Sequence, residues 1–163
     1  MTLHVLFLCT HNAARSILAE AVLNHIGAGR FKAYSAGSSP RGNQRPHPMA
    51  LDVLEKAGIS TAGLRSKSWD EFGLPDAPRM DLVITVCDNA AGEACPYWPG
   101  RPATAHWGYP DPSEAQGDEA HRLEAFRQTL HAIRRRLELL VNLPAASLDR
   151  MVLQSTARGL ADA

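Results

Sequence analysis

LFLCTHNAARSILAEA, residues 6–21, joins an apolar run to a helical pattern through one short loop. The run 3–8 is short and continuous, which is typical of a strand buried on both faces. Apolar residues at helical spacing then predict a helix over 16–27. Cys9 stands at the end of the strand, and Arg15 stands where the helix begins. The stretch therefore predicts a strand, a loop and a helix, with a thiol and a guanidinium at the two ends of the loop.

The same alternation of strand and helix continues along the chain. We expect strands at 31–39, 80–87 and 104–108, a helix from Pro48 to Gly58, a short helix at 66–72, a long helix through 123–140 that ends before Pro144, and a weaker helix at 148–160. This order predicts one α/β domain over residues 1–163, with a parallel sheet between layers of helices. Such sheets bind ligands at the carboxyl ends of their strands, so Cys9 and Cys87 are expected to lie near each other.

Composition excludes several classes of function. The 17 basic and 17 acidic residues cancel, which argues against nucleic acid or an acidic membrane surface as the main partner. No apolar run approaches the roughly 20 residues that span a bilayer, and the N-terminus is not expected to be a signal peptide. Three cysteines do not make a disulfide scaffold, so we expect a reducing cytoplasm. The histidines form no zinc pattern, and the arginine run 134–136 is interpreted as a solvated helix face.

The loop after Cys9 has the composition of an oxyanion site. Loop amides and the positive end of a helix dipole attract an anion, and a guanidinium matches two oxygens of a tetrahedral one. The same setting favours a thiolate at Cys9, to which Ser16 can donate a hydrogen bond. The alternative is a buried core cysteine with Arg15 at the surface. The combination favours a nucleophile beneath an oxyanion cradle formed by Thr10, His11, Asn12, Ala13, Ala14 and Arg15. No glycine-rich nucleotide motif is present.

Four motifs carry a resemblance to a known family: CTHNAARS (9–16), SAGSSP (35–40), VCDNAAGEACPYWPG (86–100) and HWGYPDPS (106–113). The first resembles the active-site loop of low-molecular-weight protein tyrosine phosphatases. Together they resemble the phosphatase-like, thioredoxin-coupled arsenate reductases over nearly the whole chain. The resemblance implies a four-stranded parallel sheet flanked by helices, and an enzyme of arsenic detoxification without a tightly bound cofactor.

The resemblance also implies a mechanism with three thiols. Reduction of As(V) to As(III) needs two electrons, which two thiols supply when they become a disulfide. Cys9 would attack arsenate, Cys87 would attack the sulfur of Cys9, and Cys95 would move the disulfide to Cys87–Cys95. An external reductant would then act, and thioredoxin, glutaredoxin or another small thiol all remain open. We expect a mobile loop over 88–100 for this exchange.

Other roles follow from the resemblance alone. Asp111 would be the acid that protonates the leaving oxygen, while Asn12 and Ser35 would brace the loop. Some relatives bind a monovalent cation such as K⁺ near the equivalents of Asn12, Glu20 and Ser35, which leaves that option open here. Two rival functions remain: a tyrosine phosphatase, which would not need Cys87 or Cys95, and a non-catalytic oxyanion or arsenite sensor that uses the three thiols.

Overall fold

A computed structural model describes residues 2–40, 45–87, 102–144 and 156–161 of the chain. Four parallel strands form one sheet in the order β2-β1-β3-β4, with bounds β1 Leu3–Cys9, β2 Phe31–Gly37, β3 Leu82–Thr85 and β4 Ala103–His106. The predicted four-stranded parallel sheet is confirmed. The strand that carries Cys9 is central and has a neighbour on each side.

Helices follow the strands as the sequence predicts: α1 Arg15–Ile26, α2 Pro48–Lys56, the 3-10 helices η1 Trp69–Gly73 and η3 Pro112–Glu114, and α3 Glu119–Val141. Side chains cap several of them at the N-terminus. Ser68 accepts from the Asp70 N–H at η1, and Asp118 accepts from the His121 N–H at α3. In the expected helix at 148–160, residues 156–160 are helical, and 148–155 lie outside the described residues.

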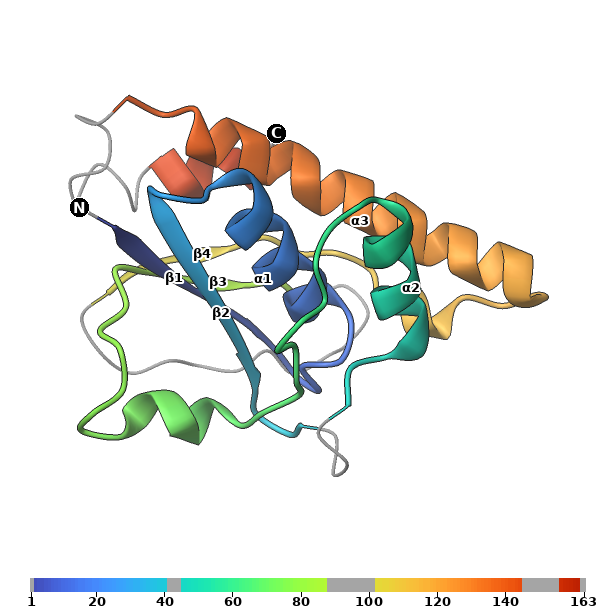
Figure 1. The fold of residues 1–163 in the computed structure, drawn as a ribbon, viewed down its shortest axis with the longest axis horizontal. Helices are drawn as coiled ribbons and strands as arrows, with labels where there is room; N and C mark the ends of the chain where they lie inside the picture. The colour runs from blue at the N-terminus through green and yellow to red at the C-terminus, as the bar shows by residue number, and fades with distance from the viewer. Residues whose placement is uncertain (1, 41–44, 88–101, 145–155, 162–163) are drawn as a thin grey trace.

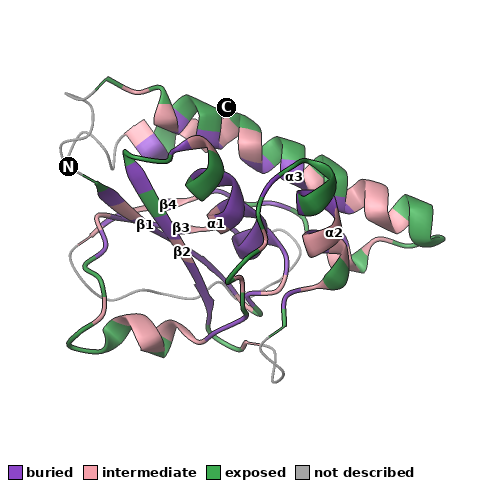
Figure 2. Ribbon diagram, viewed as in Figure 1, coloured by how far each residue is buried: buried purple, intermediate pink, exposed green. Residues whose placement is uncertain are grey.

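The two faces of the sheet are covered differently. Alternate residues of β1, among them Val5 and Phe7, pack in one large apolar cluster with residues of α1, α2 and α3. Leu6 and Leu8 point to the other face, where a smaller cluster includes Trp69 of η1. Figure 1 shows η1 set apart from the three α-helices, and Figure 2 shows the buried strands between them. Both faces of β1 are therefore buried, as its continuous apolar run predicts.

The third strand is shorter than predicted. It ends at Thr85 rather than Cys87, because its partner β4 offers only four paired residues. The Val86 N–H still donates to the carbonyl of Leu8 at 2.9 Å, so the chain stays beside β1 for one more residue. No helix in the described ranges is long and apolar enough to cross a membrane.

Candidate active site

The thiol of Cys9 lies at the carboxyl end of β1 and is 2% exposed. Its sulfur is 2.8 Å from the hydroxyl oxygen of Ser16, in the first turn of α1. The side-chain amide of Asn12 donates to that same oxygen at 2.7 Å. Because Ser16 accepts from Asn12, its own proton is directed to the sulfur. The arrangement therefore stabilises negative charge on Cys9.

The loop between β1 and α1 is tightly curled. Asn12 has a positive φ of 48°, a conformation that asparagine tolerates better than most residues. Gly37, at the end of β2, lies so close that a Cβ there would be 2.6 Å from the carbonyl oxygen of Thr10. A side chain at Gly37 would push the loop away from the sheet. The glycine of the SAGSSP motif thus sets the position of the loop.

Carbonyl groups of the loop are held by the surrounding chain. Three of them accept hydrogen bonds from outside the loop: Thr10 from the Ser39 N–H at 2.8 Å, His11 from the Ser66 hydroxyl at 2.9 Å and Ala13 from the His47 N–H at 2.8 Å. Ala14, the residue that precedes α1, provides no side-chain cap. The residue before α1 thus leaves the start of the helix uncapped, and helix N-termini are sites at which proteins bind anions.

Arg15 and Asp111 meet at the mouth of the site. Arg15 is 3% exposed and donates from Nη1 to the carbonyl of Tyr109 at 3.0 Å. Its Nη2 lies 3.6 Å from Oδ2 of Asp111, in the loop after β4. The other carboxylate oxygen accepts from the backbone N–H and the hydroxyl of Ser113, at 3.0 and 2.7 Å. Asp111 is therefore held in place with one oxygen directed to the guanidinium.

These groups enclose a cavity of about 110 Å³, lined by Cys9, His11, Ala13, Ala14, Arg15, His47, Asp111 and Ser113. The volume is that of about three or four water molecules, which suits a small tetrahedral ion. The sequence does not indicate His47 or Ser113 as part of the site. Pro48 does predict that a helix begins beside His47, whose Nδ1 caps α2 by accepting from the Met49 N–H at 3.1 Å. Only the fold shows that this helix begins at the cavity.

Beneath the loop lies a second charged group, centred on Lys67. The ammonium is 3.6 Å from a carboxylate oxygen of Glu20, 3.4 Å from the Ser35 hydroxyl and 2.9 Å from the carbonyl of Arg65. Ser35 also donates to Glu20. Burial lowers the pKa of Lys67 and raises that of Glu20, while the attraction between the two charges opposes both shifts. The sequence places Lys67 in an expected short helix at 66–72, but the helix begins at Trp69, and nothing in the sequence indicates that Lys67 is buried against Glu20.

Cys87 follows the strand next to Cys9 and is fully buried. Neither Cys9 nor Cys87 is in a disulfide. Because Leu8 pairs with Thr85, the two thiols leave adjacent strands at the same edge of the sheet, as expected. Cys87 does not line the cavity over Cys9, and Val86 instead packs in the same apolar cluster as Cys9. Cys95 and the expected mobile loop over 88–100 lie outside the described residues.

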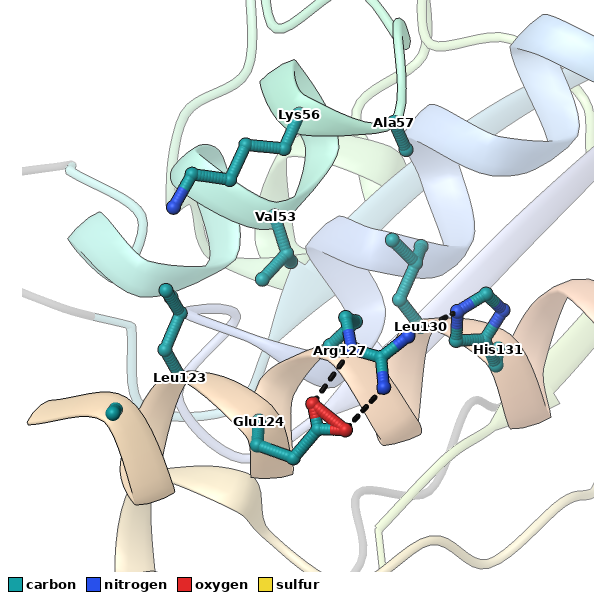
Figure 3. Close-up of a pocket in the computed structure, with 9 residues that line it drawn as sticks. Val53, Lys56, Ala57, Leu123, Glu124, Arg127, Leu130 and His131 are labelled. Carbon is teal, nitrogen blue, oxygen red and sulfur yellow. Dashed lines mark hydrogen bonds and ion pairs between the residues drawn. The ribbon is translucent and has the colours of Figure 1, made fainter.

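A larger cavity, of about 420 Å³, lies between α2 and α3 (Figure 3). Val53, Leu123 and Leu130 give it an apolar wall, and its Glu124 and Arg127 side chains pair with each other. No cysteine, serine or threonine lines it. Across the described ranges, no group of three or more histidine, cysteine or acidic side chains could hold a metal ion. Within these ranges, the cavity over Cys9 is therefore the better candidate for chemistry.

Known proteins resemble the chain over most of its length. The family model for low molecular weight phosphotyrosine protein phosphatase matches residues 4–153. The arsenate reductase of Bacillus subtilis (strain 168) is 34% identical over 134 residues, which cover 82% of this chain and 91% of that protein. The glutaredoxin arsenate reductase of Synechocystis sp. is 29% identical over 84% of this chain and 95% of that protein.

Solved structures agree with these relatives. The arsenate reductase from Archaeoglobus fulgidus DSM 4304 superimposes with a TM-score of 0.69 at 30% identity, over 85% of this chain and 99% of that one. The thioredoxin-dependent arsenate reductase of Corynebacterium glutamicum gives a TM-score of 0.55 at 27% identity, over 85% of this chain and 63% of that one. By sequence and by fold, the chain belongs to the low molecular weight phosphotyrosine protein phosphatase family.

Proposed function

We propose that the chain reduces arsenate to arsenite, with Cys9 as the nucleophile. The observation that carries the proposal is the Cys9 sulfur, 2.8 Å from the Ser16 hydroxyl, at a cavity that Arg15 lines. A cavity of this kind binds phosphate and arsenate alike, because both are tetrahedral oxyanions. Two further thiols and the arsenate reductases among its relatives favour reduction over hydrolysis.

The first step forms a bond between sulfur and arsenic. The Cys9 thiolate attacks the arsenic atom while the Arg15 guanidinium and the loop amides hold the other oxygens. One oxygen leaves as water, and Asp111 provides the proton for it. In the structure Asp111 is 3.6 Å from Arg15, so a bound oxyanion would enter between partners that are already in place. Arsenic remains As(V) at this point.

Reduction occurs in the second step. The Cys87 thiolate attacks the sulfur of Cys9, and a disulfide forms between them. The sulfur–arsenic bond breaks, and its electron pair stays on arsenic, which leaves as As(III) in arsenite. Two thiols have then lost the two electrons that arsenic gained. Cys87 does not line the cavity over Cys9, so its sulfur must approach the Cys9 sulfur from the neighbouring strand in this step.

A third exchange returns Cys9 to its starting form. The Cys95 thiolate attacks the sulfur of Cys87, a Cys87–Cys95 disulfide forms, and Cys9 leaves as a thiolate. An external dithiol then reduces this disulfide. We assign that role to thioredoxin, with glutaredoxin as the alternative, because the relatives include an enzyme named for each. A relay that starts each cycle from reduced cysteines suits a reducing cytoplasm.

Hydrolysis of phosphate esters is expected as a side activity. Cys9, Arg15 and Asp111 would form a phosphocysteine just as they form the arsenic adduct, and water would then release phosphate. This reaction needs neither Cys87 nor Cys95. A sensor that bound arsenite through three thiols would leave both Arg15 and Asp111 without a role.

Arsenate-dependent oxidation of NADPH, coupled through thioredoxin and its reductase, tests the proposal. We expect turnover in the wild type and a loss of about 100-fold or more in Cys87→Ser and Cys95→Ser. Both variants should still hydrolyse p-nitrophenyl phosphate, whereas Cys9→Ser should lose both activities. The phosphate ester is the matched control, because it reports an intact cavity without the relay.

Two outcomes would overturn the proposal. Full turnover in Cys95→Ser would exclude the relay. Hydrolysis of the phosphate ester without arsenate-dependent turnover, with thioredoxin or with glutaredoxin, would assign the chain as a phosphatase.

A further inference from the structure

The Lys67 ammonium occupies a site made of oxygen atoms. Its contacts come from three separate parts of the fold: the Glu20 carboxylate on α1, the Ser35 hydroxyl on β2 and the carbonyl of Arg65. The side chain is only 9% exposed. An ammonium has three donors, and three oxygen atoms surround this one.

The charges of Lys67 and Glu20 depend on each other. The Glu20 side chain is 14% exposed, so neither group is well hydrated. Removing one partner of such a pair leaves the other charge buried without compensation. The carboxylate therefore requires a cation at this position, and the chain supplies its own.

The backbone of Lys67 reaches the nucleophile through a short series of hydrogen bonds. The Lys67 N–H donates to the side-chain oxygen of Asn12 at 2.9 Å, and the Asn12 amide donates to Ser16 at 2.7 Å. Ser16 is the residue that contacts the Cys9 sulfur. The carbonyl of Lys67 accepts from the Gly37 N–H at 2.9 Å, which ties the same segment to the end of β2.

We propose that Lys67 is a positioning residue that takes the place of a bound monovalent cation. Its ammonium fixes α1 and β2 through Glu20 and Ser35, and its backbone holds Asn12 and hence Ser16 in place at the sulfur. The reactivity of Cys9 is then independent of K⁺, so the option of a K⁺ ion beside Asn12, Glu20 and Ser35 is closed by a side chain of the protein itself. The inference rests on Cys9 being the nucleophile of the proposed function, but not on arsenate as substrate.

Chemical rescue tests the proposal. We would measure p-nitrophenyl phosphate hydrolysis and the rate of Cys9 alkylation by iodoacetamide, in KCl and in choline chloride at equal ionic strength. The protein would carry Cys87→Ser and Cys95→Ser, so that only Cys9 reacts. Neither readout needs arsenate or a reductant, so a failed reductase assay would not affect this result.

The Cys87→Ser/Cys95→Ser protein that keeps Lys67 should hydrolyse the ester, and should be alkylated at Cys9, at equal rates in the two salts. Lys67→Ala should lose about 10- to 100-fold in both rates in choline chloride. The variant keeps the backbone N–H that contacts Asn12, but without the ammonium its segment is no longer fixed to Glu20 and Ser35, so Asn12 and Ser16 are held less firmly at the sulfur. KCl, but not choline chloride, should restore part of the loss, since K⁺ is small enough to enter the vacated site. Lys67→Arg should recover most of the activity by keeping the charge.

Lys56 provides a matched control. It is an exposed lysine on α2 whose ammonium pairs with Asp52 at 3.0 Å. Lys56→Ala removes the same charge and should change neither rate.

A folded Lys67→Ala protein with undiminished rates in choline chloride would overturn the proposal. A several-fold increase of either rate by KCl in the protein that keeps Lys67 would also overturn it. If Lys67→Ala does not fold, the salt comparison on the Lys67 protein and the activity of Lys67→Arg decide the matter, and a Lys67→Arg protein without activity would contradict the proposal.

Discussion

Two ion pairs lie close to the nucleophile loop, Arg15–Asp111 and Lys67–Glu20, and they differ in what surrounds them. In each, the charged atoms are 3.6 Å apart and both side chains are mostly buried. Arg15 and Asp111 both line the cavity, where an oxyanion can come between them. Lys67 and Glu20 do not line it, and the chain itself supplies their oxygen contacts. The first pair is therefore suited to exchange a partner during reaction, and the second to keep one.

Charge-conserving substitutions should separate the two pairs most clearly. Arg15→Lys keeps the positive charge but loses the planar fork that contacts two oxygens, so kcat/KM should fall about 1,000-fold. Lys67→Arg should lower kcat/KM less than about 10-fold, because its site requires a charge rather than a fork. Steady-state kinetics with p-nitrophenyl phosphate and with arsenate would measure both. Equal losses in the two variants would remove the distinction between the pairs.

The Lys67–Glu20 pair should matter more for the stability of the fold than for catalysis. Lys67→Met leaves Glu20 buried without a partner and should lower the free energy of unfolding by about 3–5 kcal/mol. The double variant Glu20→Gln/Lys67→Met removes both charges and should recover most of that loss. Urea denaturation followed by tryptophan fluorescence would measure this. A double variant no more stable than Lys67→Met would show that packing, rather than charge, causes the loss.

The stability loss in Lys67→Met should also depend on pH. Burial already raises the pKa of Glu20 above its ordinary value of 4.5, and the charge of Lys67 opposes that rise. Without Lys67 the pKa rises further. A carboxyl whose pKa is raised by folding stabilises the fold fully below its unfolded pKa, and this is lost as the pH rises through the folded pKa. The deficit should therefore be smaller at about pH 5 than at about pH 8, and absent from the double variant.

The sequence predicts the groups that line the cavity better than those that support it. Cys9 and Arg15 stand at the junction of two strongly periodic segments, and both lie at the carboxyl edge of the predicted parallel sheet. Asp111 has no such signal, and only the resemblance indicates it. The positions of Cys9 and Arg15 at the cavity thus follow from local sequence patterns and from the topology of the sheet.

Lys67 was beyond prediction for a physical reason. Its segment has a short helical pattern, but its partners Glu20 and Ser35 are far away in sequence and meet it only through the packing of α1 and β2. The interpretation of residues 134–136 as a solvated face is wrong for Arg136 in the same way. Its guanidinium lies 4.8 Å from the ring centre of Tyr109, a residue distant in sequence. Charges buried by tertiary contacts leave no periodic signal.

A substitution at Tyr109, which lies beside the Arg15–Asp111 pair, should have the smallest effect on stability. Its side chain is 5% exposed, and its buried hydroxyl has no partner of good hydrogen-bond geometry among the described residues, although the Arg136 guanidinium lies close enough to oppose the rise in its pKa. Burial raises the pKa of Tyr109 to about 12, so the ring is neutral at any working pH. Tyr109→Phe keeps the ring under Arg136 and the backbone carbonyl that holds Arg15, while it removes an unsatisfied polar group.

We expect Tyr109→Phe to leave the free energy of unfolding unchanged or to raise it by up to about 1 kcal/mol. Ser35→Ala is the contrasting variant, because that buried hydroxyl donates to Glu20 and lies 3.4 Å from the Lys67 ammonium. It should cost about 1–2 kcal/mol. Urea denaturation of the two variants gives both values. If Tyr109→Phe lowered the free energy of unfolding as much as Ser35→Ala, the Tyr109 hydroxyl would have a hydrogen-bond partner in solution. Side-chain hydrogen bonds would then stabilise the loop that bears Asp111 as much as the segment around Lys67.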